Sequence, residues 1–306
     1  MSSRSLSLGT TGDTVVKVRG AGVAAVVVLF NPPDDLADNI RSYLGQVERV
    51  IAVDNTPEPA AEIVATLEEM GVVHIALGEN RGIGAALNLG CEKAMELGSE
   101  FAITLDQDSA AARGMVERLL SCLGEGDSDD VISVVPRLQQ VGGLPIELQA
   151  SCIELSYAIT SGAILRLSGA AALGGFREDY FIDQVDHEFC MRARRNGWRI
   201  LQRRDAVLEH RMGELTQARR PFRFYYTNYS ALRRYYMVRN LLETRRVFGS
   251  ENADWLRDER RQWIKDLPKM FLAEPDKLRK LKFMYQGWRD FRRGRFGRYE
   301  DIHLQR

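Results

Sequence analysis

The chain has 306 residues, 45% of them hydrophobic, and its 42 basic residues balance 42 acidic ones. A chain of this length and composition can form one large α/β domain with an appendage, or two modest domains. The zero net charge gives no reason to expect nucleic acid as a partner. The sequence shows no signal-peptide pattern and no apolar run of about 18 or more residues that would span a bilayer, which predicts a cytoplasmic protein.

The four cysteines are far apart and show neither a CxxC motif nor a Cys/His metal-binding spacing. They are Cys91, Cys122, Cys152 and Cys190. This usage predicts free thiols in a reducing compartment.

After a Ser-, Gly- and Thr-rich tail at residues 1–20, the first half alternates short apolar runs with helical stretches. Strands are predicted at 23–30, 49–55, 72–77 and 101–105, separated by helices near 36–46, 60–70 and 83–97. Such βαβ units form a parallel sheet that binds ligands beyond the carboxyl ends of its strands. Polar residues at those ends are therefore expected to share one crevice, namely Asn31, Asp54, Asn55, Asn80, Asp106 and Asp108.

The second half is predicted to hold a helix at 111–123 and a fifth strand at 131–135. A further strand at 159–165 is broken by Ser161 and Gly162. A helix is expected to open at Phe181, with acids at its entrance, and to end near Asn196, where Gly197 follows. A returning strand at 198–202 and a mostly helical segment from residue 225 complete the chain.

The segment Asp106-Gln107-Asp108 ends a buried strand with two carboxylates. If the chain bends there, the carboxylates converge and need a hard cation such as Mg²⁺ or Mn²⁺. The alternative is that Asp108 only caps the next helix and Asp106 is a surface acid. Asp186 or Glu188 could then accept a proton, although these acids could equally have a purely dipolar role at a helix N-terminus.

Two other interpretations are disfavoured. The glycines at 78, 82 and 84 lack the third small residue of a dinucleotide-binding fingerprint, and they follow the third strand rather than the first. A haloacid-dehalogenase-like phosphatase also uses two aspartates after a strand, but usually on the first strand and followed by different residues.

The ordered motifs resemble the family 2 glycosyltransferases and, within them, the bacterial rhamnosyltransferases that use dTDP-L-rhamnose. The resemblance covers roughly residues 23–245 and includes Asp54-Asn55, Asn80-Arg-Gly82, Asp106-Gln-Asp108, the segment Phe181 to Phe189, and Arg239-Asn240. It implies a GT-A fold, with a Rossmann-like, mostly parallel central sheet, helices on both faces and a C-terminal helical region. After the tail at 1–20, it implies a catalytic domain at 21–245, with a nucleotide-sugar half at about 21–135 and an acceptor half at about 136–245. Residues 246–306 would be a separate basic and aromatic region.

The resemblance also implies roles for individual residues. Nucleotide-sugar contacts would come from Asn31, Asp54, Asn55, Asn80, Gly82, Asn88, Asp106, Gln107 and Arg239, the last of them to phosphate. Asn80 and Asn88 would lie near the base or support the loop. The metal ligands would be Asp108, Asp106 and His210, and the acceptor would contact Ser161, Gly162, Asp183 and Glu188. Asp186 is the expected base, with Asp183 left open as an alternative. The segment between Glu209 and Phe222 would be a lid.

The implied activity is an inverting, metal-dependent transfer of L-rhamnose from dTDP-L-rhamnose to a saccharide or lipid-linked saccharide in surface-polysaccharide synthesis. Two alternatives stay open: a UDP-sugar donor such as UDP-galactofuranose or UDP-N-acetylglucosamine, and a non-catalytic nucleotide- or glycan-binding relative.

The C-terminal stretch 255–306 interleaves basic residues with aromatic ones. One interpretation is a surface for anionic lipid on the inner face of the membrane. The other is a helical subdomain that packs on the core or on a second subunit, as in a homodimer.

Overall fold

The computed structural model describes residues 22–124, 128–140, 149–210, 216–218 and 224–304. The predicted tail at 1–20 lies outside these residues.

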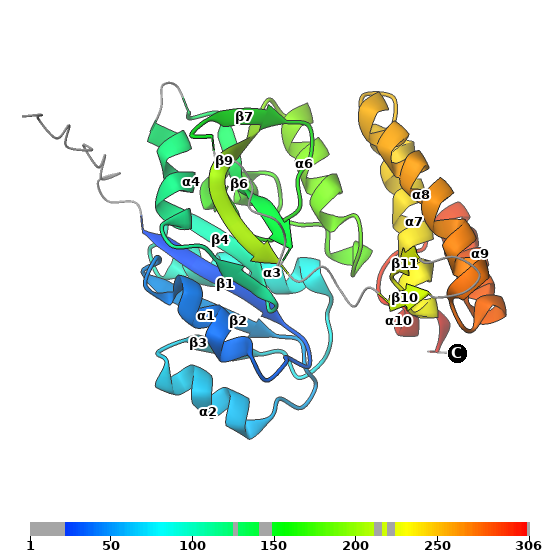
Figure 1. Cartoon of the computed structure of the whole chain (residues 1–306), viewed down its shortest axis with the longest axis horizontal. Helices are drawn as coiled ribbons and strands as arrows, with labels where there is room; N and C mark the ends of the chain where they lie inside the picture. The colour runs from blue at the N-terminus through cyan, green and yellow to red at the C-terminus, as the bar shows by residue number, and fades with distance from the viewer. Residues whose placement is uncertain (1–21, 125–127, 141–148, 211–215, 219–223, 305–306) are drawn as a thin grey trace, which may run out of the picture.

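The first half forms the predicted βαβ series. The strands are parallel and lie in the order β3-β2-β1-β4, with a helix between each pair in the chain (Figure 1). They are β1 (Val23–Leu29), β2 (Arg49–Asp54), β3 (Val73–Ala76) and β4 (Phe101–Asp106), and the helices are α1 (Leu36–Leu44), α2 (Ala61–Glu69) and α3 (Ile83–Glu96).

Alternation along β1 divides the core into two layers. Val23, Ala25 and Val27 pack with α1 on one face, whereas Ala24 and Val26 pack with α3 on the other. Because successive strand side chains point to opposite faces, an unbroken run of small and β-branched residues fits a strand covered on both sides. This confirms helices on both faces of a central sheet.

The second half extends the sheet with mixed pairing. Strand β8 runs antiparallel to β4, β6 pairs antiparallel with β8, and β9 runs parallel to β6, giving a nine-stranded sheet within the described ranges. The short strands β5 and β7 both pair antiparallel with β9 and were not predicted. The elements here are β5 (Ser109–Ala111), α4 (Met115–Gly124), β6 (Val131–Gln140), β7 (Cys152–Leu155), β8 (Ala163–Arg166), α5 (Leu167–Ala172), the 3₁₀ helix η1 (Glu178–Tyr180), α6 (Val185–Arg195) and β9 (Arg199–His210).

The expectation of four free thiols is wrong for two cysteines. Cys122 on α4 and Cys152 on β7 form a disulfide, with their Cα atoms 6.1 Å apart, while Cys91 and Cys190 are free and buried. The two partners are 30 residues apart in the chain. Only the packing of α4 beside β7 brings them together, so no local spacing could have indicated the pair.

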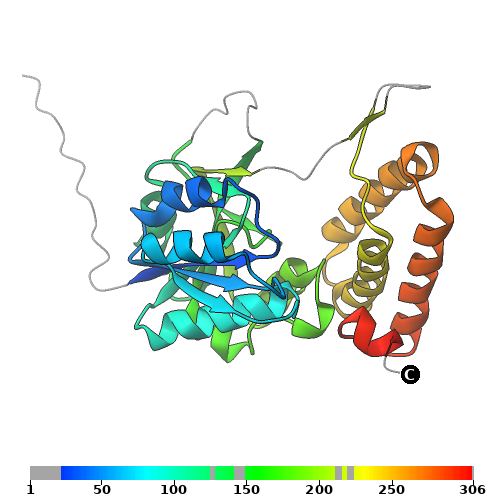
Figure 2. The ribbon, with the colours of Figure 1, turned by 90° about the horizontal axis from the view of Figure 1, so that it is seen from below.

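The C-terminal helices lie together at one end of the molecule (Figures 1 and 2). They are α7 (Ala231–Phe248), α8 (Ala253–Ala273), α9 (Lys277–Arg292) and α10 (Tyr299–His303), and the hairpin β10 (Thr216–Ala218) and β11 (Phe224–Tyr226) precedes them. Helix α7 packs along α9 and also contacts α6. The domain boundary expected at residue 245 thus falls inside α7. Among the described helices, none is both long and apolar enough to cross a membrane.

Candidate active site

The carboxyl ends of three strands are joined by polar contacts at one edge of the sheet. The Gln107 side chain after β4 accepts from the Phe30 N–H (2.9 Å) and donates to the Phe30 carbonyl (3.2 Å) after β1. The backbone N–H of Asn31 donates to Thr56 Oγ1 after β2 (2.8 Å). Asn31 itself is exposed at the end of β1. The predicted convergence of strand ends is therefore confirmed for β1, β2 and β4.

Asp54 and Asn55 close β2 as buried polar residues. Asp54 accepts from the Thr56 N–H (2.8 Å) and lies 3.3 Å from His74 Nε2. Asn55 accepts from the Arg81 N–H (3.0 Å) and donates to the Gly82 carbonyl (3.3 Å). Asn55 thus holds the loop after β3 against the end of β2.

The loop after β3 is fixed to the second half of the chain. Asn80 Oδ1 accepts from the Gly82 N–H (3.0 Å), and the Ile83 N–H donates to the Phe181 carbonyl (2.8 Å). Gly82 has a φ of 87°, and a Cβ there would lie 2.6 Å from the Phe181 oxygen. Only glycine fits this contact, so the spacing of this motif serves the junction between the halves.

Asn88 on α3 has its amide engaged within the protein. It donates to the Phe176 carbonyl (2.9 Å) and to Glu178 Oε1 (2.8 Å), and accepts from the Phe176 N–H (2.7 Å). Of the two roles expected for Asn88, these contacts indicate the supporting one rather than a contact with the base.

A polar cavity of about 350 Å³ lies beside the same loop. Asn80 and Arg81 line it together with Arg298 and Asp301 from the C-terminal segment. Arg298 also lies 3.2 Å from Glu79 Oε2. The C-terminal segment therefore borders the nucleotide-sugar half.

Asp106, Gln107 and Asp108 form the turn between β4 and β5, and all three are half-buried. The chain bends there as predicted. The Asp106 N–H donates to Ser161 Oγ (3.3 Å), which shares a 2.8 Å hydrogen bond with Ser109 Oγ. Ser161 is 2% exposed, so it supports the acidic turn from the interior of the protein.

The residues packed around Gly162 require a glycine at this position. Its φ is 78°, and a Cβ would lie 2.7 Å from Pro136 Cγ. Its N–H donates to the Thr104 carbonyl (2.6 Å). The positions of Ser161 and Gly162 therefore indicate support for β4 rather than the expected acceptor contact.

The acidic turn suits a hard cation. Within the described ranges, no group of three or more His, Cys, Asp or Glu residues could hold a metal. Mg²⁺, however, is usually held by one or two carboxylates, with substrate phosphates and water completing its shell. The carboxylates of Asp106 and Asp108 fit that donor set. The backbone of His210 pairs with Ser109 in the sheet, but its side chain, like most of the expected lid, lies outside the described part of the chain.

Asp183, in the turn before α6, forms an ion pair with Arg233 on α7. Arg233 Nη2 lies 3.2 Å from Asp183 Oδ1, and Arg233 Nε lies 3.3 Å from Asp183 Oδ2. Burial raises the pKa of the Asp183 carboxyl, and the charge of Arg233 opposes that shift only in part. A carboxyl with a raised pKa that lies beside a cation and other acids is a candidate proton acceptor.

Arg233 was not identified from the sequence. Burial lowers the pKa of its guanidinium, but Asp183, Tyr229 and Asp106 together raise it. The charge of Arg233 is therefore stabilised by Asp106 from the nucleotide-sugar half and by Asp183 from the acceptor half. Its backbone N–H donates to Ser230 Oγ (3.1 Å), which caps α7 and fixes the first turn of that helix. A serine three residues before a basic pair was the one sequence signal that could have located it.

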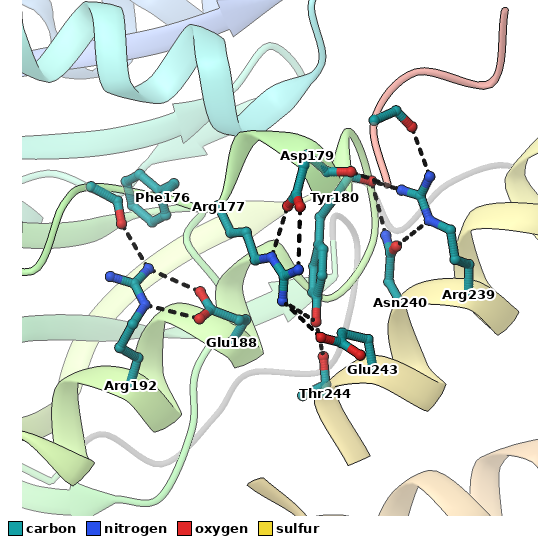
Figure 3. Close-up of polar contacts among 12 residues, drawn as sticks. Phe176, Arg177, Asp179, Tyr180, Glu188, Arg192, Arg239, Asn240, Glu243 and Thr244 are labelled. Carbon is teal, nitrogen blue, oxygen red and sulfur yellow. Dashed lines mark hydrogen bonds and ion pairs between the residues drawn. The ribbon is translucent and has the colours of Figure 1, made fainter. Parts of the chain in front are cut away.

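Asp186 begins α6 and accepts from the N–H of His187 (2.8 Å), in line with the dipolar alternative. Glu188 is 4% exposed and pairs with Arg192 through two 2.9 Å contacts (Figure 3). A buried and paired carboxylate is poorly placed for the acceptor contact expected of it.

The turn before α6 is not helical, contrary to the prediction. Phe181, Asp183 and Gln184 all have positive φ angles, of 66°, 64° and 66°. For residues other than glycine this backbone is strained and persists only when the surroundings hold it.

Asn240 on α7 holds the backbone of this turn in place. Its Nδ2 donates to the carbonyls of Tyr180 (2.9 Å), Ile182 (2.8 Å) and Asp183 (3.0 Å), and its Oδ1 accepts from Arg239 Nε (2.9 Å). Asn240 is completely buried. It therefore fixes the backbone that presents Asp183.

Arg239 is completely buried beside Asn240 (Figure 3). It donates to the carbonyls of Asp179 (2.9 Å), Tyr180 (3.0 Å) and Gly297 (2.7 Å). It could not reach a diphosphate without breaking these bonds, so its position supports the turn rather than the phosphate contact expected of it.

Comparisons with known proteins agree with this arrangement. Residues 24–164 match the family model described as glycosyl transferase family 2. The dTDP-rhamnosyl transferase RfbF of Shigella flexneri is 26% identical over 240 residues, which cover 72% of this chain and 78% of that protein.

Two solved structures show the same fold at low identity. GalNAc-T7 with UDP, GalNAc and Mn²⁺ superposes with a TM-score of 0.57 at 13% identity, over 90% of this chain and 56% of that one. S. aureus TarS 1-349 in complex with UDP-GlcNAc gives 0.51 at 15% identity, over 90% and 92%. The chain spans 39% of a longer TarS chain, which it matches with a TM-score of 0.52 and 18% identity. The expected GT-A-like fold is confirmed, and residues 24–164 carry a family 2 glycosyltransferase domain.

Proposed function

We propose that the protein is an inverting glycosyltransferase that moves L-rhamnose from dTDP-L-rhamnose to a saccharide acceptor of a bacterial surface polysaccharide. The similarity to RfbF supports the donor. The observation that supports transfer chemistry is the Asp183–Arg233 ion pair, whose cation is also acted on by the charge of Asp106.

In this proposal the donor lies along the carboxyl ends of β1, β2 and β4. Asn31 contacts the nucleoside, whereas Asp54, which is completely buried, supports the end of β2 through Thr56 and His74. Asp106 contacts the ribose or the metal. Asp108, with Asp106, would hold Mg²⁺ or Mn²⁺. The bound cation would neutralise charge that develops on the departing diphosphate.

Arg233 takes the phosphate role expected of Arg239. Its side chain is 42% exposed, and it lies in the first turn of α7 rather than within the core. When a diphosphate arrives, the guanidinium can exchange part of its pairing with Asp183 for phosphate oxygens, which it binds well in a bidentate manner.

That exchange leaves Asp183 to act as the base. Its carboxylate accepts the proton of an acceptor hydroxyl while the hydroxyl oxygen bonds to the anomeric carbon. The bond from that carbon to the diphosphate oxygen breaks, and the diphosphate leaves with the electron pair. We assign the base to Asp183 rather than Asp186, because Asp186 is engaged at the start of α6.

Calorimetric titration with dTDP, UDP and GDP, each with Mg²⁺ and with EDTA, tests the donor assignment. We expect dTDP to bind best and only with the cation. Preference for UDP would assign a UDP-sugar donor to the same fold. Absence of binding by any of the three would overturn the nucleotide-sugar site.

Substitution of the two acids tests the base. Asp183→Asn is expected to abolish transfer with little change in dTDP affinity, whereas Asp186→Asn should keep most of the transfer rate. The reverse result would return the base to Asp186. Full dTDP binding without transfer of any sugar tested, in the unmodified protein, would favour the non-catalytic alternative.

A further inference from the structure

The large hydrophobic side chains exposed by the described residues are concentrated in the C-terminal helices. Eight of the twelve lie at or after residue 264. Four belong to α9: Leu278 is 84% exposed, Leu281 37%, Tyr285 60% and Trp288 45%. A single exposed hydrophobic residue needs no explanation, but a cluster of this kind marks an interaction surface.

These four residues form one stripe along α9. Their spacing of three, four and three residues keeps them on one side of a helix that turns about 100° per residue. The rings of Tyr285 and Trp288 stack with centroids 5.6 Å apart. We call this set the α9 stripe.

The α9 stripe does not face α7. A Cβ at Gly287 would clash with the Tyr235 carbonyl, and the Asp290 carboxylate accepts from the Tyr235 hydroxyl at 3.0 Å. These contacts define the inner side of α9. At about 100° per residue, the stripe lies well away from that side, so it is left without a partner within the described chain.

Basic residues lie immediately beside the stripe. Arg279, Lys282 and Arg292 are exposed, and Arg289 is partly exposed. By the same helical geometry Arg279, Lys282 and Arg289 occupy the neighbouring strip of the outward surface, whereas Arg292 lies in line with the stripe at its C-terminal end. The acid within α9, Asp290, is completely buried, and Lys280 is turned inward to Glu274 at 2.7 Å. The outward surface of α9 therefore combines an apolar stripe with positive charge beside it and at its C-terminal end.

We propose that this surface of α9 docks the protein on a membrane that contains anionic lipids. Leu278 and Leu281 would enter the boundary of the acyl chains, and Tyr285 and Trp288 would lie at headgroup level, where amphipathic rings are favoured. The basic strip would face anionic headgroups. A second copy of the chain fits less well, because pairing two α9 surfaces would bring like charges together.

This inference does not depend on the donor or on catalysis, so it is tested without nucleotide. The full chain is floated with vesicles of phosphatidylcholine alone and with vesicles that also contain phosphatidylglycerol. One variant, Tyr285→Ser with Trp288→Ser, removes the aromatic half of the stripe. A second, Arg279→Gln with Lys282→Gln, removes charge from the neighbouring strip.

The matched control is Arg257→Gln with Arg261→Gln, which removes the same charge from exposed positions on α8. Thermal unfolding of every variant checks that the bundle remains folded. We expect binding to vesicles with phosphatidylglycerol and little binding to phosphatidylcholine alone. Each basic residue lost from α9 should weaken binding about fivefold, the aromatic variant should lose binding, and the α8 control should bind like the unmodified protein.

Failure of the unmodified protein to bind anionic vesicles would overturn the proposal. Equal losses in the α9 and α8 charge variants would also overturn it, because binding would then follow net charge rather than this surface. If sedimentation showed a dimer that the aromatic variant dissociates, the stripe would be assigned to a second copy instead.

Discussion

Replacing Asn240 by alanine should reduce catalysis strongly while leaving donor binding almost unchanged. In the structure its amide nitrogen serves the carbonyls of Tyr180, Ile182 and Asp183. Asn240→Ala removes two N–H groups from buried acceptors, which should cost roughly 2–4 kcal/mol of native-state stability.

That loss is comparable with the strain that Asn240 offsets. Three residues of the turn before α6 have positive φ, and each such residue costs of order 1–3 kcal/mol. Without Asn240 the turn is expected to relax and move the Asp183 carboxylate from its position beside Arg233. If displacement of Asp183 removes about 3 kcal/mol of transition-state stabilisation, kcat falls roughly 100-fold.

The assay compares kcat, the KM for dTDP-L-rhamnose and dTDP affinity, alongside urea unfolding. The control is Asn252→Ala, because Asn252 is also a buried asparagine and donates to the Phe248 carbonyl (2.9 Å) at the junction of α7 and α8. It should lose stability without losing kcat. The reasoning would be refuted if Asn240→Ala lost stability as expected yet kept kcat within about twofold.

Three further predictions concern charge. Arg233 stabilises the ionised form of Asp183, so Arg233→Gln should raise that pKa further and move the acid limb of the kcat/KM profile to higher pH. Arg233→Lys should move it less, and an unmoved limb in both variants would argue against Asp183 as the base. Because burial raises the folded-state pKa of Asp183, its charge opposes folding above that pKa. Asp183→Asn should therefore raise the free energy of unfolding near neutral pH, and the gain should vanish below about pH 4, where the carboxyl is protonated in both states. Urea unfolding at several pH values would show a constant difference if this account is incorrect. Finally, Glu274 pairs with Arg234 (2.8 Å) and Lys280 (2.7 Å) in the core of the C-terminal bundle. Glu274→Gln should reduce stability by about 3–5 kcal/mol, which calorimetry can measure, and a change below about 1 kcal/mol would contradict it.

The sequence by itself determined the first half of the fold. Runs such as Val23–Leu29 are apolar on both faces, and helical stretches of regular length separate them. These signals are local, and they fix a parallel sheet whose carboxyl ends meet. The positions of Asn31, Asp54, Asp106 and Asp108 at that edge followed directly. The family could also be identified, because its motifs occur in order along the chain.

The second half depended on contacts between distant residues. A helix was expected from Phe181, but φ is positive at Phe181, Asp183 and Gln184, and Asn240 holds the carbonyls of this turn from another helix. Ser161 and Glu188 carry polar groups that suit a binding site, yet both are buried. Ser161 is buried against Ser109 of β5, and Glu188 is buried beside Arg192, which binds the loop after α5. No local pattern records these contacts.

Two of the arginines of α7 show the division most clearly. Arg233 and Arg239 are six residues apart, and at about 100° per residue they lie on different sides of one helix. The motif indicated Arg239, because that residue stands beside Asn240 in the ordered pattern. Which side of α7 faces the acids and which faces the core was set only by the packing of α7 on α9 and on the turn before α6, and that packing placed Arg239 inside and Arg233 beside Asp183.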